Sequence, residues 1–129
     1  MDLTDDDLSS FDDKIVLDVG VGSGASSRLW GPRAREFHGV DIGDGIYRAK
    51  NTLKDTVKNP VLSHADLHHL PYADESFDVI ISNGVFHHTP NTKNALKCVY
   101  PKIKKGGLII FYIYLNKVLQ ILASKCEYS

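Results

Sequence analysis

Short apolar runs alternate along this chain with segments in which apolar residues recur every three or four positions. The recurring positions predict helices that begin at residue 25, cover 46–57 and cover 91–103. Strands that alternate with helices are typical of βαβ units and of a parallel sheet, so the pattern predicts an α/β domain. The apolar runs that we interpret as buried strands lie at residues 14–19, 36–42, 61–65, 77–82 and 108–115.

Proline and glycine residues limit these elements. Pro101 lies inside the third predicted helix, where it removes a backbone donor, so we expect a kink or an early end there. Gly106 and Gly107 predict a turn before the fifth strand, and residues 118–123 are expected to begin one last helix.

Length and charge set the domain organisation. The 129 residues, 43% of them apolar, fit one domain, and 15 basic against 16 acidic residues favour neither nucleic acid nor a membrane as a partner. Residues 1–13 carry six Asp and are expected to be an acidic, flexible leader before a core over 14–129. Residues 79–126 hold seven Lys and no acid, and we interpret these lysines as a solvated face rather than as an anion site.

The cysteine and histidine residues indicate in which cellular compartment the protein works and whether it binds a metal ion. Cys98 and Cys126 form no metal-type pair and suit a reducing cytoplasm, and the acidic N-terminus is no signal peptide. The longest apolar run, eight residues, is too short to cross a bilayer. Adjacent histidines on an extended chain point in opposite directions, and neither Cys nor Glu completes a ligand spacing, so no metal site is predicted. His87 or His88 is expected to line a pocket after the fourth strand.

A glycine-rich turn follows the first strand and provides the first candidate binding site. Gly20, Gly22 and Gly24 fit a G-x-G-x-G pattern, and Gly20, Gly22 and Ala25 fit the dinucleotide fingerprint G-x-G-x-x-A. Ligands of open α/β sheets bind beyond the carboxyl ends of the strands. Asp18 argues against the dinucleotide fingerprint. A carboxylate is costly beside the phosphates of a dinucleotide, whereas it suits a cationic ligand. The competing interpretation is that Asp18 only caps the following helix.

Two further carboxylates follow predicted strands. Asp41 stands 21 positions after Gly20, about where an acidic residue binds ribose hydroxyls, although it could instead form a turn before Gly43. Asp66 ends the third strand, where it could accept from an adenine amino group or form a loop turn.

These residues resemble a known family. Residues 16–24, V-L-D-V-G-V-G-S-G, resemble motif I of class I methyltransferases dependent on S-adenosylmethionine (SAM), and 39–42 resemble their second-strand motif. Residues 65–72, 77–90 and 96–107 resemble the later blocks in the same order. The resemblance implies a Rossmann-like three-layer α/β sandwich with a mainly parallel sheet of order 3-2-1-4-5. It also implies SAM as the cofactor and transfer of its methyl group to a small-molecule acceptor.

The resemblance implies a role for nine residues, whereas it assigns no catalytic residue. The methionine part of SAM would lie by Asp18 and Gly20, and Gly22 would allow its close approach. The ribose and adenine would contact residues that follow the second and third strands, and the transferred methyl would lie near the end of the fourth. The six residues assigned at the ends of the second, third and fourth strands are Asp41, Ile42, Asp66, Leu67, Ser82 and Asn83.

The chain departs from the family at its ends. Only fourteen residues follow Leu115, too few for the usual final antiparallel strand pair, so the C-terminus looks truncated. The fifth strand would then be an exposed apolar edge, and we expect self-association through it or burial beneath 118–123. Two alternatives stay open: a catalytically inactive SAM-binding remnant, and a nicotinamide-dependent dehydrogenase, which Asp18 disfavours.

Overall fold

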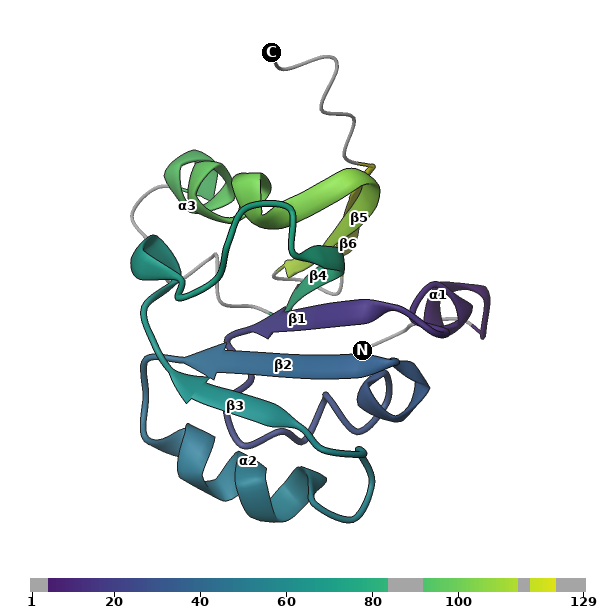
Figure 1. The fold of residues 1–129 in the computed structure, drawn as a ribbon, viewed down its shortest axis with the longest axis vertical. Helices are drawn as coiled ribbons and strands as arrows, with labels where there is room; N and C mark the ends of the chain where they lie inside the picture. The colour runs from purple at the N-terminus through teal and green to yellow at the C-terminus, as the bar shows by residue number, and fades with distance from the viewer. Residues whose placement is uncertain (1–4, 84–91, 114–116, 123–129) are drawn as a thin grey trace.

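The computed structural model describes residues 5–83, 92–113 and 117–122 and has a mainly parallel sheet at its centre (Figure 1). The strand order is β3-β2-β1-β4-β5-β6, in which the first five strands are parallel and β6 is antiparallel to β5. This arrangement confirms the predicted Rossmann-like α/β fold and the order 3-2-1-4-5. The strands are β1 (Ile15–Val19), β2 (Glu36–Asp41), β3 (Val61–His64), β4 (Phe77–Asn83), β5 (Ile103–Ile113) and β6 (Lys117–Leu122).

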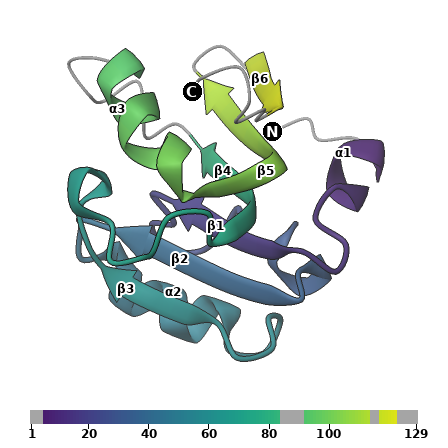
Figure 2. The same ribbon diagram turned by 45° about the horizontal axis from the view of Figure 1, so that its top comes forward.

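Two α-helices and short 3-10 helices connect the described strands, and a further α-helix precedes the first strand. The helix α2 lies against β2 and β3, and α3 lies at the other end of the sheet near β4 and β5 (Figures 1 and 2). The α-helices are α1 (Asp5–Ser9), α2 (Gly45–Leu53) and α3 (Thr92–Val99), and the 3-10 helices are Gly31–Arg33, Leu67–His69 and Tyr100–Lys102.

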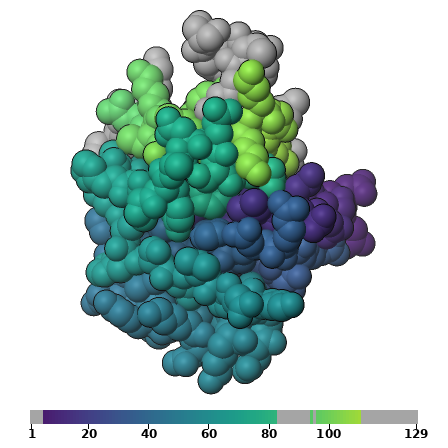
Figure 3. All heavy atoms as spheres, in the orientation of Figure 1, coloured from purple at the N-terminus to yellow at the C-terminus, as the bar shows by residue number. Residues whose placement is uncertain are grey.

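Each face of the sheet carries its own apolar core. Leu17 and Val19 of β1 belong to one core with Val99 of α3, whereas Val16 belongs to the other core with Ile46 of α2. Successive side chains of a strand point to opposite faces, so β1 supplies both layers and is buried on both sides. Figure 3 shows the segment that joins β3 to β4, in teal, over the centre of one face between the strand residues in blue and the residues of α3 and β5 in green.

The connection from β1 to β2 differs from the prediction. Residues 25–30 form turns, and a 3-10 helix at Gly31–Arg33 follows, so the helix expected to begin at residue 25 is wrong. Only six residues separate Gly24 from Gly31, too few to repay the cost of helix nucleation. Pro32 then removes a further backbone donor.

Proline and glycine residues determine where the third helix ends and where the strand after it bulges. The helix α3 ends at Val99 and Pro101 lies in a 3-10 turn, which confirms the expected early end. Gly106 and Gly107 lie inside β5 rather than in a turn before it. Phe77 of β4 pairs with Ile103 of β5, and Val79 pairs with Leu108, so a step of two residues in β4 matches a step of five in β5. Gly106, within the longer step, has a φ of 75°. The glycines therefore form a bulge in the strand.

Strand β6 overturns the prediction for residues 118–123. Residues 117–122 pair antiparallel with 108–113 instead of beginning a helix. Pairing satisfies the backbone donors and acceptors that β5 would otherwise expose, and this gain outweighs local helix propensity. The premise that the fifth strand is an open edge is therefore wrong for these residues, and self-association stays a prediction.

Part of the acidic N-terminal segment packs on the domain. Phe11 is fully buried, and its ring stacks on Trp30 with ring centroids 5.9 Å apart. Leu8, at the end of the short helix α1, also packs against this core. Residues 1–4 of the expected flexible leader lie outside the described residues.

The substitution Phe11→Ala should lower the free energy of unfolding by about 3–5 kcal/mol, because it leaves a cavity against Trp30. Urea unfolding at neutral pH measures the change. The matched control is Leu29→Ala, whose side chain is 48% exposed and whose removal should cost less than about 1 kcal/mol. Equal small effects of the two substitutions would contradict the packing of the N-terminal segment.

Candidate functional site: a pocket at the carboxyl ends of three strands

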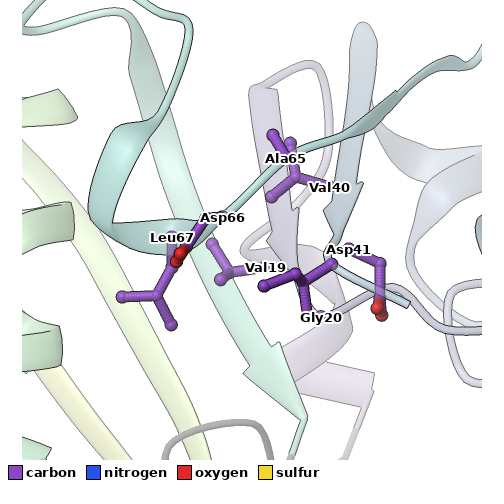
Figure 4. A pocket seen from close by; sticks show the side chains of 8 residues that line it. Val19, Gly20, Val40, Asp41, Ala65, Asp66 and Leu67 are labelled. Carbon is purple, nitrogen blue, oxygen red and sulfur yellow. The ribbon is translucent and has the colours of Figure 1, made fainter.

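A pocket of about 300 Å³ of empty space, open to solvent, lies where β1, β2 and β3 end (Figure 4). Parallel strands bring their carboxyl ends to one edge of the sheet, which is where α/β proteins bind ligands. Five of the nine predicted site residues line the pocket, and the apolar strand ends Val19, Val40 and Ala65 complete it. The five are Gly20, Asp41, Ile42, Asp66 and Leu67.

Asp41 connects the three loops around this pocket. Its Oδ2 accepts a hydrogen bond of 2.7 Å from the backbone N–H of Gly22, and its Oδ1 accepts one of the same length from Gly43. The backbone carbonyl of Asp41 accepts from Ala65 N–H at 3.0 Å. The turn with Gly43 that we considered is therefore present. A carboxylate has about four acceptor positions, so the two bonds leave capacity for ribose hydroxyls.

The glycine turn needs the conformational freedom of glycine. Gly20 and Gly22 have φ angles of 83° and 57°, a region that side chains disfavour. The N–H groups of Gly20 and Val21 both donate to the Val40 carbonyl, at 2.8 and 3.0 Å. These bonds and the bond to Asp41 hold the turn against β2, with Gly20 lining the pocket.

Asp18 lies beneath this turn with its side chain 1% exposed. Its Oδ2 accepts hydrogen bonds from Ser27 Oγ at 2.5 Å and from Trp30 Nε1 at 3.0 Å, whereas Oδ1 has no partner within the described residues. Burial raises the pKa of Asp18 to about 6, the two hydrogen bonds oppose this rise, and the charge of Asp41 adds to it. Asp18 caps no helix, because residues 25–30 form none.

Asp66 forms a local turn at the far wall of the pocket. Its Oδ1 accepts from the His68 backbone N–H at 3.0 Å and lies 2.9 Å from His68 Nδ1. The backbone bond, followed by the ring contact, lowers the pKa of Asp66, which therefore stays a carboxylate. The loop-turn interpretation is correct, and Oδ2 has no partner in the described part of the chain. The adenine contact stays a prediction.

Ile42 forms the exposed rim of the pocket, with 69% of its surface accessible. The Ile42 carbonyl lies 2.6 Å from His64 Nε2, and because a carbonyl only accepts, this nitrogen carries the proton. The His64 ring also meets Tyr47 of α2 edge-on, with centroids 6.1 Å apart. The rim is therefore tied to β3 and supported by α2.

The remaining predicted residues lie at the end of β4, outside the pocket lining. Ser82 is buried and its Oγ has no partner within the described residues. Asn83 is the last residue of β4 and pairs with Tyr112 of β5. The proposed pocket residues His87 and His88 lie outside the described residues.

Metal and membrane interpretations find no support in the part of the chain that the structure describes. No group of three or more His, Cys, Asp or Glu side chains is placed to bind a metal ion there. Among the same residues, no helix is both long enough and apolar enough to cross a membrane.

Comparison with known proteins identifies the family. Residues 17–111 match the model of a methyltransferase domain, so the chain belongs to the class I SAM-dependent methyltransferase family. Malonyl-[acyl-carrier protein] O-methyltransferase of Halorhodospira halophila is 31% identical over 98 residues, which are 74% of this chain and 33% of that protein.

Solved structures share the fold. The PH0226 protein of Pyrococcus horikoshii OT3 matches with a TM-score of 0.70 and 30% identity over 78% of this chain and 49% of its own. N-methyltransferase NodS of Bradyrhizobium japonicum WM9, solved with S-adenosyl-L-homocysteine, matches with a TM-score of 0.72 over 81% of this chain and 54% of its own. At 22% identity, the NodS match supports the fold alone. The chain spans less than half the length of the first curated relatives it matches.

No sequence pattern pointed to several residues that shape this site. Ser27 and Trp30 bind Asp18 across an irregular connection, and no periodic pattern relates them to it. His64 and His68 hold the rim and the far wall, although the sequence indicates no such role for either residue. The only hint was that the chain's one tryptophan follows the glycine turn.

The buried charge of Asp18 should make stability depend on pH. The pKa of Asp18 is about 6 in the folded protein against 3.8 for the free side chain, so the folded state binds more protons between these values. Its destabilising contribution is therefore complete above pH 6 and disappears as the pH falls toward 4. Relative to Asp18→Asn, the wild type should gain about 2 kcal/mol in free energy of unfolding from pH 7 to pH 4.

Urea unfolding of both proteins across this pH range measures the gain. Asp44→Asn, a change on an exposed residue beside the site, serves as the control and should keep the pH profile of the wild type. Parallel profiles for the wild type and Asp18→Asn would show that Asp18 does not titrate in this range.

Proposed function

We propose that this chain binds SAM in the pocket at the ends of β1, β2 and β3 and transfers its methyl group to a small-molecule acceptor. The observation that carries the proposal is the pair of carboxylates, Asp18 and Asp41, around a glycine turn that lines this pocket. SAM supplies a methyl group on a cationic sulfur and carries an ammonium group, and both charges suit a site with two carboxylates.

The residues present fit the cofactor on structural grounds. Gly22 leaves its Cβ position open toward Asp41, whose Oδ2 would be 4.0 Å from an added Cβ, so a ligand can approach the turn closely. Asp41 keeps acceptor capacity for two ribose hydroxyls, and Asp66 keeps a free Oδ2 for an amino group. Ile42 and Leu67 supply apolar walls for a flat base between them.

The chain's part in methyl transfer is to bind and orient. In-line displacement depends mainly on placing the acceptor atom against the methyl group, so no general base needs to be assigned. Ser82 and Asn83, at the end of β4, are proposed to border the methionine part and the methyl group. Family members that methylate planar amino groups can carry Asn-Pro-Pro and an aromatic residue after the fourth strand. This chain has N-G-V-F at 83–86 instead, which argues against nucleobase and glutamine amides as acceptors.

Two further parts of the proposal rest on the sequence. A cytoplasmic location is supported by only two cysteines without a metal-type spacing. A catalytically inactive SAM-binding chain is the second candidate. The two candidates share the cofactor site and differ in turnover.

Calorimetric titration with SAM and S-adenosyl-L-homocysteine, with NAD as the negative control, tests the cofactor site. We expect micromolar binding of the first two and none of NAD. Asp41→Asn should weaken SAM binding by about 1.5–3 kcal/mol, roughly ten- to hundredfold, because a charge-assisted acceptor for ribose is lost. The amide substitution keeps the size of the side chain and one acceptor oxygen for the glycine turn.

The matched control is Asp44→Asn, three residues further along the chain and outside the pocket lining, which should leave the affinity unchanged. Failure of a folded wild-type sample to bind either nucleoside would overturn the proposal. Binding without transfer of a labelled methyl group to any compound in a small-molecule extract would favour the inactive alternative.

A further inference from the structure

The Asp18 carboxylate is held on one side only. Ser27 and Trp30 both donate to Oδ2, and the fully buried Oδ1 has no partner within the described residues. A buried charge without full compensation is expensive, and its field acts over several ångströms because the surroundings are poorly polarisable. The next residues along the chain, Val19 and Gly20, line the pocket. The Asp18 side chain points to the opposite face of the sheet from Val19, so its charge acts on the proposed ligand through space and not by contact.

We propose that Ser27 and Trp30 are positioning residues for SAM, which act by keeping Asp18 ionised beneath the glycine turn. The inference rests on the proposed function. It assigns roles to Ser27 and Trp30 and makes SAM binding depend on the protonation state of Asp18. The ionised carboxylate attracts the ammonium and the sulfonium of SAM, whereas a protonated Asp18 does not. Binding of the cationic cofactor therefore requires Asp18 to lose its proton, and affinity falls as the pH falls.

The groups around Asp18 have opposing effects on its pKa. Burial and the negative charge of Asp41 raise the pKa of Asp18, whereas the bonds from Ser27 and Trp30 lower it. Ile81 of β4 and Gly39 of β2 lie opposite Asp18 in the sheet and carry no titratable group. Removal of either donor therefore moves the titration to higher pH.

The connection that carries the two donors has no helix to hold it in place. Residues 25–30 form separate turns, and Ser27 and Trp30 are both buried beneath the sheet. The bonds to Asp18 span nine and twelve positions of the sequence, so they fix the irregular connection to β1. Their geometry keeps Oδ2 occupied and leaves the buried Oδ1 without a partner among the described residues.

The experiment compares two ligands between pH 5 and pH 7. SAM carries the ammonium and the sulfonium, and 5′-methylthioadenosine keeps the adenosine part without either charge. The ratio of their two Kd values isolates the methionine end, because groups near the ribose and adenine affect both ligands. For the wild type, we expect this ratio to change with a midpoint near pH 6, with SAM weakest at low pH.

Ser27→Ala should raise this midpoint by about one pH unit, since one charge-assisted bond is lost. At pH 6 the ionised fraction of Asp18 then falls from about one half to about one tenth, so the Kd for SAM rises about fivefold. Trp30→Phe should shift the midpoint in the same direction, Ser27→Thr should restore it, and Asp18→Asn should abolish the pH dependence. Ser9→Ala, on the exposed helix α1, is the control.

The outcomes separate the inference from the proposed function. Wild-type protein that binds neither ligand overturns both. Wild-type protein that binds both ligands with a pH-independent ratio, or a Ser27→Ala variant that keeps the midpoint of the wild type, overturns the inference alone. A purely structural role of Ser27 and Trp30 would weaken both ligands equally and leave the midpoint in place, which also overturns it.

Discussion

The Asp41 carboxylate is the constraint on which the site depends. One side chain at the end of β2 binds the glycine turn after β1 through Gly22 and the loop before α2 through Gly43. The next strand is attached through the Asp41 carbonyl and Ala65. Hydrogen bonds from backbone N–H groups to a carboxylate are among the stronger ones in proteins, so three loops take one arrangement around the pocket.

Asp18 has the opposite effect on stability: its buried charge destabilises the fold, whereas the hydrogen bonds of Asp41 stabilise it. A carboxylate that is 1% exposed beside a second carboxylate is destabilising in its charged form. The proposed cationic ligand explains a charge at this buried position, and the hydrogen bonds from Ser27 and Trp30 limit its cost. The same two bonds fix the turns between β1 and β2, so the stability of the connection and the charge of the site are coupled.

Where local pattern and tertiary packing agree, the sequence predicted the structure well. The buried strands, the helix α2 and the end of α3 near Pro101 follow from periodicity and from proline chemistry, whereas the strand order was implied by the family resemblance. The predictions failed at 25–30 and 118–123, where a short segment could take either form. In the first segment the chain is too short between glycines for a helix, and in the second the open edge of β5 selects a strand.

The sequence by itself determined the class of the protein through its resemblance to a family. It also placed Gly20, Asp41 and Asp66 at the pocket, because glycines and carboxylates after parallel strands gather at one edge of the sheet, whereas Ile42 and Leu67 were assigned by the resemblance alone. Only the tertiary structure decided which groups those carboxylates bind. Asp18 meets Trp30 and Asp66 meets His68 through the path of irregular connections. Such contacts depend on the fold of the whole chain, whereas strand periodicity depends only on neighbouring residues.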